Sequence, residues 1–213
     1  MTTKRNHWEQ VYRARSSEER SWFQPQPAIS LDLIALAGAD DSARIIDVGG
    51  GTSHLVDALL TRGYRNVTVL DISSAALEEA KQRLGAQAAQ VQWVEADVTS
   101  GVALGAFDLW HDRAVFHFLI DRQERDAYVH ALEDALEAGG HAMIATFAED
   151  GPSQCSGLPV VRYSPPSLLA ELGPSFSLVD SRKERHRTPA GRVQSFVYCL
   201  FRRSEPEEPG ASR

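Results

Sequence analysis

The sequence predicts an α/β fold built on a seven-stranded, mainly parallel sheet with helices on both faces and a C-terminal antiparallel hairpin. Strand-like and helix-like segments alternate regularly from residue 43 to residue 147, which is typical of a parallel sheet. The strand-like segments RIIDV and HAMIATF are continuously apolar, as expected for strands buried on both faces. Beyond residue 148 the alternation stops, and two strand-like segments joined by a short connection predict an antiparallel pair.

In the first half of the chain, helices are indicated by apolar side chains at helical spacing and by a glycine at the end of each run. The helix over residues 73–85 also begins at a serine, a preferred N-cap, and stops at Gly85. Helices are predicted over residues 30–38, 53–63 and 73–85, and short β-branched runs predict strands over 43–48, 66–71 and 91–97.

In the second half, the clearest helix covers residues 121–140, where Tyr128, Leu132 and Leu136 recur every four residues and two glycines follow. A short helix over 165–173 begins with prolines, which suit a first helical turn. Strands are predicted within 107–116 and over 141–147, 175–185 and 193–203. The charged run SRKERHR in the first strand of the closing pair is typical of a solvated edge strand.

Size and composition limit the class of protein. A chain of 213 residues fits one large α/β domain, and its formal net charge of -7 argues against general affinity for nucleic acid or an anionic membrane. The two cysteines, Cys155 and Cys199, form neither a metal-type spacing nor a disulfide framework. We therefore expect a cytoplasmic protein, a monomer or weak dimer, with no metal site and no nucleic-acid or membrane partner.

Aspartates stand at the ends of three successive predicted strands: Asp47, Asp71 and Asp97. In an open α/β sheet, ligands bind outside the carboxyl ends of the strands. Asp71 follows Gly51 at the distance from which a carboxylate can reach the ribose hydroxyls of a nucleoside laid over a glycine loop. The alternative for each single aspartate is that it caps the next helix or turn.

The glycines Gly49, Gly50 and Gly51 discriminate between possible ligands. A dinucleotide fingerprint needs glycine at its first, third and sixth positions, but the sixth position here is His54. A phosphate-binding P-loop needs a lysine followed by serine or threonine, which this loop lacks. The remaining pattern is an aspartate, two alternating glycines and Ser53 in place of a third glycine.

With these features the sequence resembles the class I S-adenosylmethionine-dependent methyltransferases, through DVGGGTS, VTVLDIS, VEADV and the closing hairpin. The resemblance covers most of residues 43–203 and implies a Rossmann-like fold and S-adenosylmethionine as cofactor. It implies that the glycines approach the methionine and ribose, that Asp47 orients the loop, that Asp71 binds the ribose, and that Asp97 binds the adenine amine. The cofactor-binding residues so expected are Asp47, Gly49, Gly50, Gly51, Ser53, Asp71, Ile72, Asp97, Val98 and Trp22.

The fourth strand, FDLWHDRAVFHFL, is similar to that of the thiopurine, tellurite-resistance and protein-lysine methyltransferases. The resemblance implies that Asp112 and Arg113 lie beside the methionine end of the cofactor or the acceptor. The alternative for Arg113 is a structural ion pair with Asp112 or a neighbouring helix. His111 and His117 are the nearest candidates for a general base, and for each the alternative is a purely structural histidine.

The expected organisation is an N-terminal helical cap over residues 1–40, a core over 41–203 and a disordered tail over 204–213. Trp8, Tyr12, Trp22 and Phe23 are candidates for a lid that excludes water, or else for a terminal helix packed on the sheet. After the fifth strand, Cys155 can either contact an acceptor or be an ordinary loop thiol.

The leading hypothesis is an enzyme that transfers a methyl group to a small-molecule nucleophile, such as a thiol or another heteroatom. A protein lysine methyltransferase and a non-catalytic S-adenosylmethionine-binding protein are the alternatives. A nicotinamide dehydrogenase ranks last because His54 breaks its fingerprint.

Overall fold

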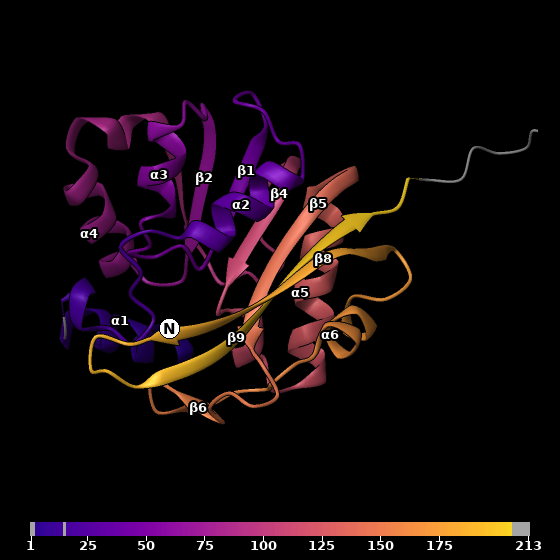
Figure 1. Ribbon diagram of the computed structural model, residues 1–213. Helices are drawn as coiled ribbons and strands as arrows, with labels where there is room; N and C mark the ends of the chain where they lie inside the picture. The colour runs from indigo at the N-terminus through magenta and orange to yellow at the C-terminus, as the bar shows by residue number, and fades with distance from the viewer. Residues whose placement is uncertain (1–2, 15, 206–213) are drawn as a thin grey trace, which may run out of the picture.

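The structure is a computed structural model that describes residues 3–14 and 16–205. One seven-stranded sheet runs through it in the order β3-β2-β1-β4-β5-β9-β8, with helices on both faces (Figure 1). Its strands are β1 (Arg44–Val48), β2 (Asn66–Asp71), β3 (Val91–Glu95), β4 (Phe107–Arg113), β5 (Leu136–Phe147), β8 (Phe176–Arg187) and β9 (Val193–Arg203). The α-helices are α1 (Thr3–Ala14), α2 (Ala28–Leu36), α3 (Leu55–Thr61), α4 (Ser74–Leu84), α5 (Arg122–Ala135) and α6 (Pro165–Leu172).

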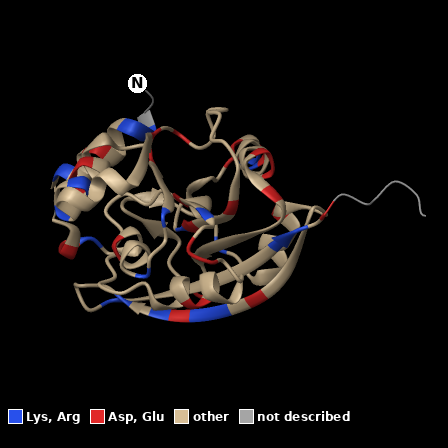
Figure 2. Ribbon diagram, turned by 90° about the horizontal axis from the view of Figure 1, so that it is seen from above, with Lys and Arg blue, Asp and Glu red and all other residues tan. Residues whose placement is uncertain are grey.

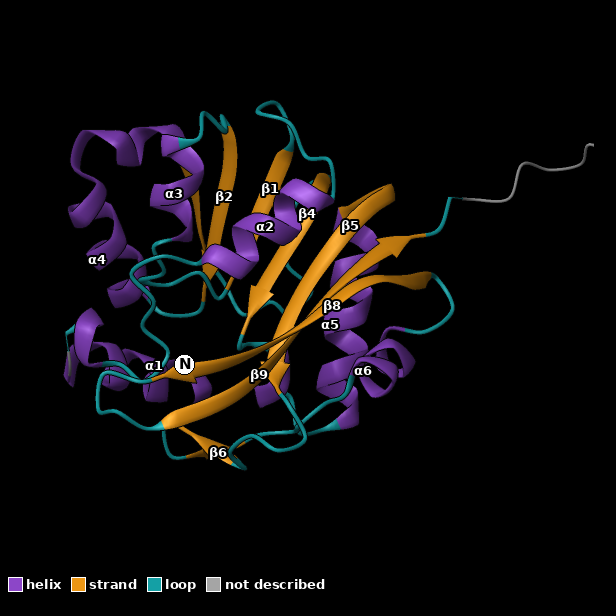
Figure 3. Ribbon diagram, viewed as in Figure 1, coloured by secondary structure: helices purple, strands orange, loops and turns teal. Residues whose placement is uncertain are grey.

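Alternate side chains of the buried strands supply the two faces of the sheet. In β1, Ile46 packs in the cluster that holds α5 and α6, whereas Ile45 packs in the cluster that holds α3 and α4. Figure 3 shows these helices around the sheet. The helix α2 contributes Leu33 to a third cluster on β5 and β9 and therefore packs on the sheet. The predicted α/β class, the mainly parallel sheet and the helices on both faces are confirmed.

The chain changes direction across the sheet between β1 and β4. From β1 it continues through β2 to β3 on one side, and β4 and β5 then pair on the other side of β1. The register of the parallel strands sets Asp47 beside His111 and Val48 beside Asp112. The carboxyl ends of β1 and β4 therefore form the switch point, where open α/β sheets bind their ligands.

The closing pair is antiparallel, as predicted, and β9 lies between β5 and the edge strand β8. Side chains of both charge signs follow one another along the outer strand β8 (Figure 2). Such charges protect an edge against pairing with another chain. The predicted solvated strand therefore lies at the edge of the sheet, where we expect its charges to protect it.

Two boundaries differ by about five residues from the sequence prediction, and most others by one to three. The helix predicted over residues 121–140 ends at Ala135, and β5 already begins at Leu136. The glycines accommodate an irregularity in the pairing of β4 with β5 rather than ending a helix, because a Cβ on Gly140 would lie 3.0 Å from the carbonyl oxygen of Asp108. Of the tail predicted over 204–213, residues 206–213 lie outside the described part of the chain.

A short hairpin interrupts the loop expected after β5. Its strands are β6 (Gln154–Cys155) and β7 (Leu158–Pro159), and the two turn residues, Ser156 and Gly157, have φ of 50° and 80°. Positive φ at both positions is the conformation of a tight hairpin turn. A Ser-Gly dipeptide is a sequence pattern that favours such a turn. None of the described helices has the length and apolar character needed to cross a membrane.

A buried hydrogen-bond chain joins β4 to α5. Trp110 Nε1 donates to the hydroxyl of Tyr128 at 2.8 Å, and that hydroxyl donates to Oδ2 of Asp112 at 2.6 Å. All three side chains are fully buried. Because buried polar groups need partners, Tyr128 satisfies an indole and a carboxylate at once and fixes α5 against the end of β4.

Tyr128→Phe is expected to lower the free energy of unfolding by about 1–3 kcal/mol, because it deprives Trp110 and Asp112 of a buried partner. Denaturant unfolding followed by circular dichroism measures the loss. The matched control is Tyr64→Phe, which removes a half-buried hydroxyl that donates to the Ala39 carbonyl at 3.0 Å. A loss no larger than in the control would contradict the importance of the chain.

Candidate functional site

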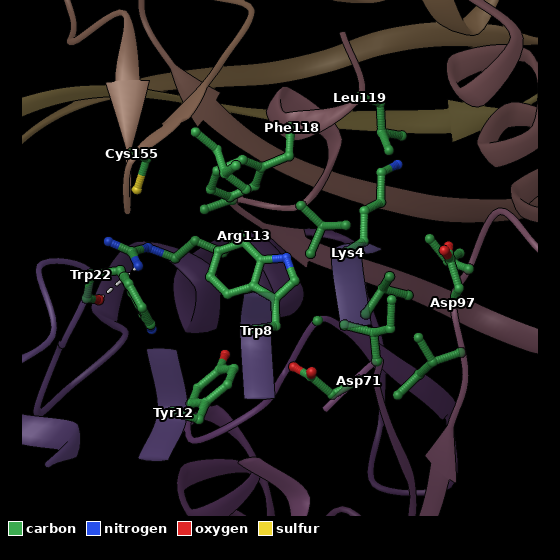
Figure 4. Close-up of a pocket in the computed structure, with 18 of the residues that line it drawn as sticks. Lys4, Trp8, Tyr12, Trp22, Asp71, Asp97, Arg113, Phe118, Leu119 and Cys155 are labelled. Carbon is green, nitrogen blue, oxygen red and sulfur yellow. Dashed lines mark hydrogen bonds between the residues drawn. The ribbon is translucent and has the colours of Figure 1, made fainter. Parts of the chain in front are cut away.

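A pocket lies at the carboxyl ends of β1, β2 and β4, beneath α1 (Figure 4). Six of the residues predicted to bind a cofactor line it, together with one predicted catalytic residue. These are Gly49, Asp71, Ile72, Asp97, Val98 and Trp22, with Arg113. A narrower recess on the other side of the glycine loop is lined by Asp47, Gly49, Gly50, Ser53 and His111.

The glycine loop after β1 has no space for side chains. Gly49 and Gly51 have φ of 64° and 46°, which favour glycine. A Cβ on Gly49 would lie 2.0 Å from Cγ2 of Val115, and one on Gly51 would lie 2.6 Å from the hydroxyl of Tyr12. At Gly50 the obstacle is Oδ2 of Asp47, 2.6 Å away. The loop backbone is therefore bare and closely surrounded.

Asp47 lies under this loop in a buried hydrogen-bond chain. His111 Nδ1 donates to Oδ1 of Asp47 at 2.7 Å, and the hydroxyl of Ser30 lies 2.9 Å from Nε2 of the same ring. The other carboxylate oxygen, Oδ2 of Asp47, is buried and has no hydrogen-bond partner among the described residues. An unsatisfied buried carboxylate oxygen is costly and calls for a ligand or water.

Asp71 ends β2 at the floor of the pocket. Its Oδ1 accepts from the backbone N–H of Ser73 at 2.8 Å, while Oδ2 lies where a Cβ on Gly51 would meet it. Burial raises the pKa of Asp71 to about 7, although the Ser73 bond acts in the opposite direction; the charge of Asp47 and that of Glu9 raise it further. The carboxylate therefore gains from any hydroxyl that donates to it.

Asp97 lies just beyond β3. One oxygen, Oδ1, accepts from the backbone N–H and the hydroxyl of Thr99 at 2.9 and 2.7 Å, which closes a local turn. The side chain also lines the pocket, next to the buried Val98. Asp97 therefore stabilises its own turn, as the structural alternative predicts, and also faces the pocket, as the binding prediction requires.

The structure buries Asp112 away from the pocket. Its Oδ1 accepts from the backbone N–H of Val115, and Oδ2 accepts from that of Phe116 as well as from Tyr128. Burial raises the pKa of Asp112 to about 6, against the effect of these hydrogen bonds. The residue fixes the turn after β4 and is not among those that line the pocket.

Neither predicted base faces the main pocket. His117 is fully buried, its Nδ1 accepts from the backbone N–H of Phe147 at 3.2 Å, and burial lowers its pKa to about 3. His111 is turned to the opposite side of the loop, with both ring nitrogens bonded. At neutral pH the His117 ring is uncharged.

Arg113 reaches into the pocket from the end of β4, and its partners come from distant segments. Its Nε donates to the hydroxyl of Tyr198 at 2.8 Å, its Nη1 donates to the carbonyl of Trp22 at 2.9 Å, and Glu184 lies 3.8 Å from Nη2. The guanidinium stacks over the ring of Phe196. The ion pair is therefore with Glu184 on β8 rather than with Asp112.

The helix α1 covers the pocket and is tied to three elements of the core. Lys4 pairs with Glu124 on α5, and Arg5 pairs with Glu95 on β3. Oε1 of Glu9 accepts from two hydroxyls and a backbone N–H at the start of α4. The helix therefore bridges the pocket from one side to the other.

The underside of this cover is aromatic. The ring of Trp8 contacts the rings of Tyr12, Trp22 and Phe118 with centroids 6.2, 6.1 and 5.0 Å away. These four aromatic side chains line the pocket together (Figure 4).

The segment after α1 is held by the side chain of Arg20 and by two of its own backbone carbonyls. Arg20, fully buried, donates to the carbonyl of Tyr12 at 2.7 Å and forms two hydrogen bonds with Glu79. The carbonyl of Ser21 lies 2.8 Å from Nε2 of His186, and that of Trp22 accepts from Arg113.

Some lining residues had no recognisable sequence signal. Gln194 and Phe196 come from β9, and Leu158 comes from the short β7. Cys155, on β6, reaches the pocket because the Ser-Gly turn folds the loop back. Within residues 3–14 and 16–205, no three His, Cys, Asp or Glu residues gather into a group that could hold a metal ion.

Comparison with known proteins agrees with this geometry. Residues 45–140 match the family described as a methyltransferase domain. The protein named Methyltransferase srdJ, from Neurospora crassa, is 26% identical over 210 residues, which cover 96% of this chain and 84% of that protein.

Two solved structures share the fold. One comes from a study of the conversion of a disulfide bond into a thioacetal group during echinomycin biosynthesis; its TM-score is 0.75 at 23% identity, over 93% of this chain and 92% of that one. The other is the 1,6-didemethyltoxoflavin-N1-methyltransferase of Burkholderia thailandensis, solved with 1,6-didemethyltoxoflavin and S-adenosylhomocysteine. Its TM-score is 0.68 at 20% identity, over 95% of this chain and 85% of that one.

Gly49→Ala is expected to destabilise the protein by more than the cost of its backbone conformation, about 1–2 kcal/mol for an L-residue in the left-handed region. The added Cβ would lie 2.0 Å from Val115. Thermal unfolding should show a larger drop in Tm than for Gly101→Ala, where φ is 73° and nothing lies within 4 Å.

A double-mutant cycle with Val115→Ala tests the cause, because removing Cγ2 should restore part of the stability lost in Gly49→Ala. Equal losses for Gly49→Ala and Gly101→Ala, with no coupling in the cycle, would show that the contact with Val115 does not matter.

Proposed function

We propose that this protein, a class I S-adenosylmethionine-dependent methyltransferase by its methyltransferase domain and fold, transfers the methyl group to a small-molecule nucleophile, such as a thiol or another heteroatom. The observation that carries the proposal is the aromatic cover formed by Trp8, Tyr12 and Trp22, which closes the pocket over the end of β4. A small acceptor fits under such a cover. The structurally similar 1,6-didemethyltoxoflavin-N1-methyltransferase was solved with 1,6-didemethyltoxoflavin bound. This small molecule supports the same class of acceptor.

The residues present suit the cofactor. We assign the bare backbone of Gly49 and Gly51 to the methionine and ribose, and Asp71 to the ribose hydroxyls. Asp97, whose Oδ2 is not used in its turn, is assigned with the backbone of Val98 to the adenine amine. Asp47, with a buried oxygen that lacks a described partner, holds the loop from below.

When bound, S-adenosylmethionine supplies a methyl group on a positively charged sulfur, already activated for in-line displacement. The protein's part is alignment and exclusion of water, which can be worth up to about 7–11 kcal/mol where the geometry is good. Arg113, at the end of β4, stacks on the ring of Phe196 from β9. We assign its guanidinium to present positive charge to the acceptor.

Proton removal is not assigned to His111, His117 or Asp112. Both nitrogens of His111 are bonded, His117 accepts a backbone hydrogen bond, and Asp112 already accepts three hydrogen bonds. We propose instead that the acceptor arrives with a lone pair free to react. The cap predicted for residues 1–40 is assigned as a lid in its first part, α1 and the segment to Gln24.

The proposal is tested by incubating the protein and radiolabelled S-adenosylmethionine with a cell extract, then separating macromolecules from small molecules. Label in a small molecule other than S-adenosylmethionine, in excess of that formed by extract without the added protein, is the expected result. Label on protein would support the lysine methyltransferase, and S-adenosylmethionine binding without any transfer would support a non-catalytic protein.

Asp71→Ala is expected to weaken the binding of S-adenosylhomocysteine at least about tenfold, the loss of one charge-assisted hydrogen bond. Asp71→Asn keeps an oxygen for the Ser73 N–H and should be intermediate. Calorimetry measures the affinity, and Asp126→Ala, an exposed carboxylate on α5, is the control. Unchanged affinity in both Asp71 variants would refute the ribose assignment.

Nucleoside affinity should rise with pH up to about 7 and then level off. The pKa of Asp71 is raised to about 7 in the free protein, mainly by burial, and hydroxyl donors favour its ionised form, so protonation at lower pH competes with binding. Well below pH 7 the affinity should fall by up to about tenfold per pH unit.

Methylthioadenosine is the suitable probe, because it carries the ribose and no group that titrates near neutral pH. Asp71→Asn should flatten its pH profile. A profile that is flat in the wild-type protein as well would exclude Asp71 as the titrating group.

A further inference from the structure

A second cavity of about 630 Å³ lies beside the first pocket. Residues of α1, the segment at Arg20–Trp22, the β6–β7 hairpin and the start of β9 line it. It shares Trp22, Cys155 and Gln194 with the first pocket, so these residues form the junction between the two (Figure 4). Its volume lies within the usual range for small-molecule sites.

The charge of this second cavity is opposite to that of the protein. The chain has 29 acidic and 22 basic residues, yet no Asp or Glu is among the described residues that line the cavity. Its cationic side chains are Arg20 and Arg192. Arg20 is neutralised by Glu79, whereas the guanidinium of Arg192 forms no hydrogen bond or ion pair with the residues that the structure describes. The uncompensated charge is therefore positive.

Two further residues that line the second cavity each have a polar atom without a hydrogen-bond partner among the described residues. Nε2 of His7 and Oε1 of Gln194 are shielded from solvent and form no hydrogen bond with a described residue. Both residues line the second cavity. Buried polar atoms are normally bonded, and a rotation of either side chain towards the cavity would let Nε2 of His7 donate, or Oε1 of Gln194 accept, a hydrogen bond.

The junction leads towards Arg113. Trp22, whose carbonyl accepts from Arg113, stands on one side, and the Sγ of Cys155 stands on the other (Figure 4). Burial raises the pKa of the Cys155 thiol, which is therefore uncharged at neutral pH and takes no proton from a ligand. A molecule held in the second cavity would reach the first pocket between these two side chains.

We propose that the second cavity binds the methyl acceptor and that this acceptor is a small anion, with a negative group remote from its reacting atom. Arg192 holds the negative group, Nε2 of His7 donates a hydrogen bond to it, and the reacting atom enters the first pocket between Trp22 and Cys155. This assignment rests on the proposed function.

The transfer balances without a base from the protein. A lone pair of the acceptor forms the bond to the methyl carbon, the carbon–sulfur bond of the sulfonium breaks, and its electron pair stays on sulfur as a neutral thioether. An acceptor that carries a proton loses it to water beforehand. A lysine ammonium is disfavoured in this cavity, because Arg192 and Arg113 repel it.

Binding of two product-like probes tests the charge assignment independently of turnover. 4-(Methylthio)benzoate and thioanisole differ only in a carboxylate remote from sulfur, and each is titrated calorimetrically into protein saturated with S-adenosylhomocysteine. The wild type should bind the carboxylate at least about tenfold more tightly than thioanisole. Arg192→Glu should abolish this preference, with thioanisole affinity unchanged.

The matched control is Arg185→Glu, the same charge change at an exposed position on β8 that does not line the cavity. Absence of a preference in the wild type, or its equal loss in both variants, would overturn the proposal. Steady-state methylation of 4-mercaptobenzoate and thiophenol then tests the proposed function separately. Charge-dependent binding without methylation of any acceptor would leave this site standing and count against methyl transfer to small molecules.

The passage is tested by Cys155→Phe against Cys155→Ala. The bulky side chain should reduce methyl transfer at least about tenfold while methylthioadenosine still binds as in the wild type, which also reports an intact fold. Equal rates in the two variants would place the passage elsewhere.

Discussion

Close packing around the glycine loop after β1 determines the rest of the site. Val115, Asp47 and Tyr12 each occupy the space that a side chain of the loop would need. They come from the β4 turn, from β1 itself and from α1, so a single loop fixes three elements relative to one another. Because protein interiors tolerate few voids and little overlap, a shift in any of the three would be transmitted to the loop backbone. The loop is rigid because of what surrounds it, although glycine alone would make it flexible.

Charge is segregated along the pocket. The carboxylates Asp71 and Asp97 lie where β2 and β3 end, and the guanidiniums of Arg113 and Arg192 lie towards β9. Hydroxyl and amine donors of a nucleoside suit the first end, and an electron-rich acceptor suits the second. Positive charge at the end proposed for the acceptor also offsets the net charge of -7, which would otherwise repel an anion at long range. The proposed cofactor and the proposed acceptor are therefore matched by charge to opposite ends.

Local features of the sequence were sufficient for most of the fold. Strand ends, helix caps and the glycine loop depend on residues close together in the chain, and these were predicted well. The contacts of the β4 side chains were harder to predict. Arg113, for example, has Tyr198 and Glu184 as partners, and both follow it by more than 70 residues. The orientation of His111 and His117 away from the main pocket depended on strand register and on a buried backbone donor. The requirement for glycine at position 50 became clear only from the structure, because a Cβ there would collide with the carboxylate of Asp47.

Two main-chain oxygens of the segment that follows α1, those of Ser21 and Trp22, attach it to His186 and Arg113. Every amino acid carries the same carbonyl, so these attachments do not depend on the identity of the residues that provide them. Ser21 lines the second cavity, which we propose binds the acceptor, and a change of its side chain would leave this main-chain attachment in place. Descendants of such a protein could exchange one acceptor for another by single substitutions, while the architecture that binds the cofactor stays unaltered.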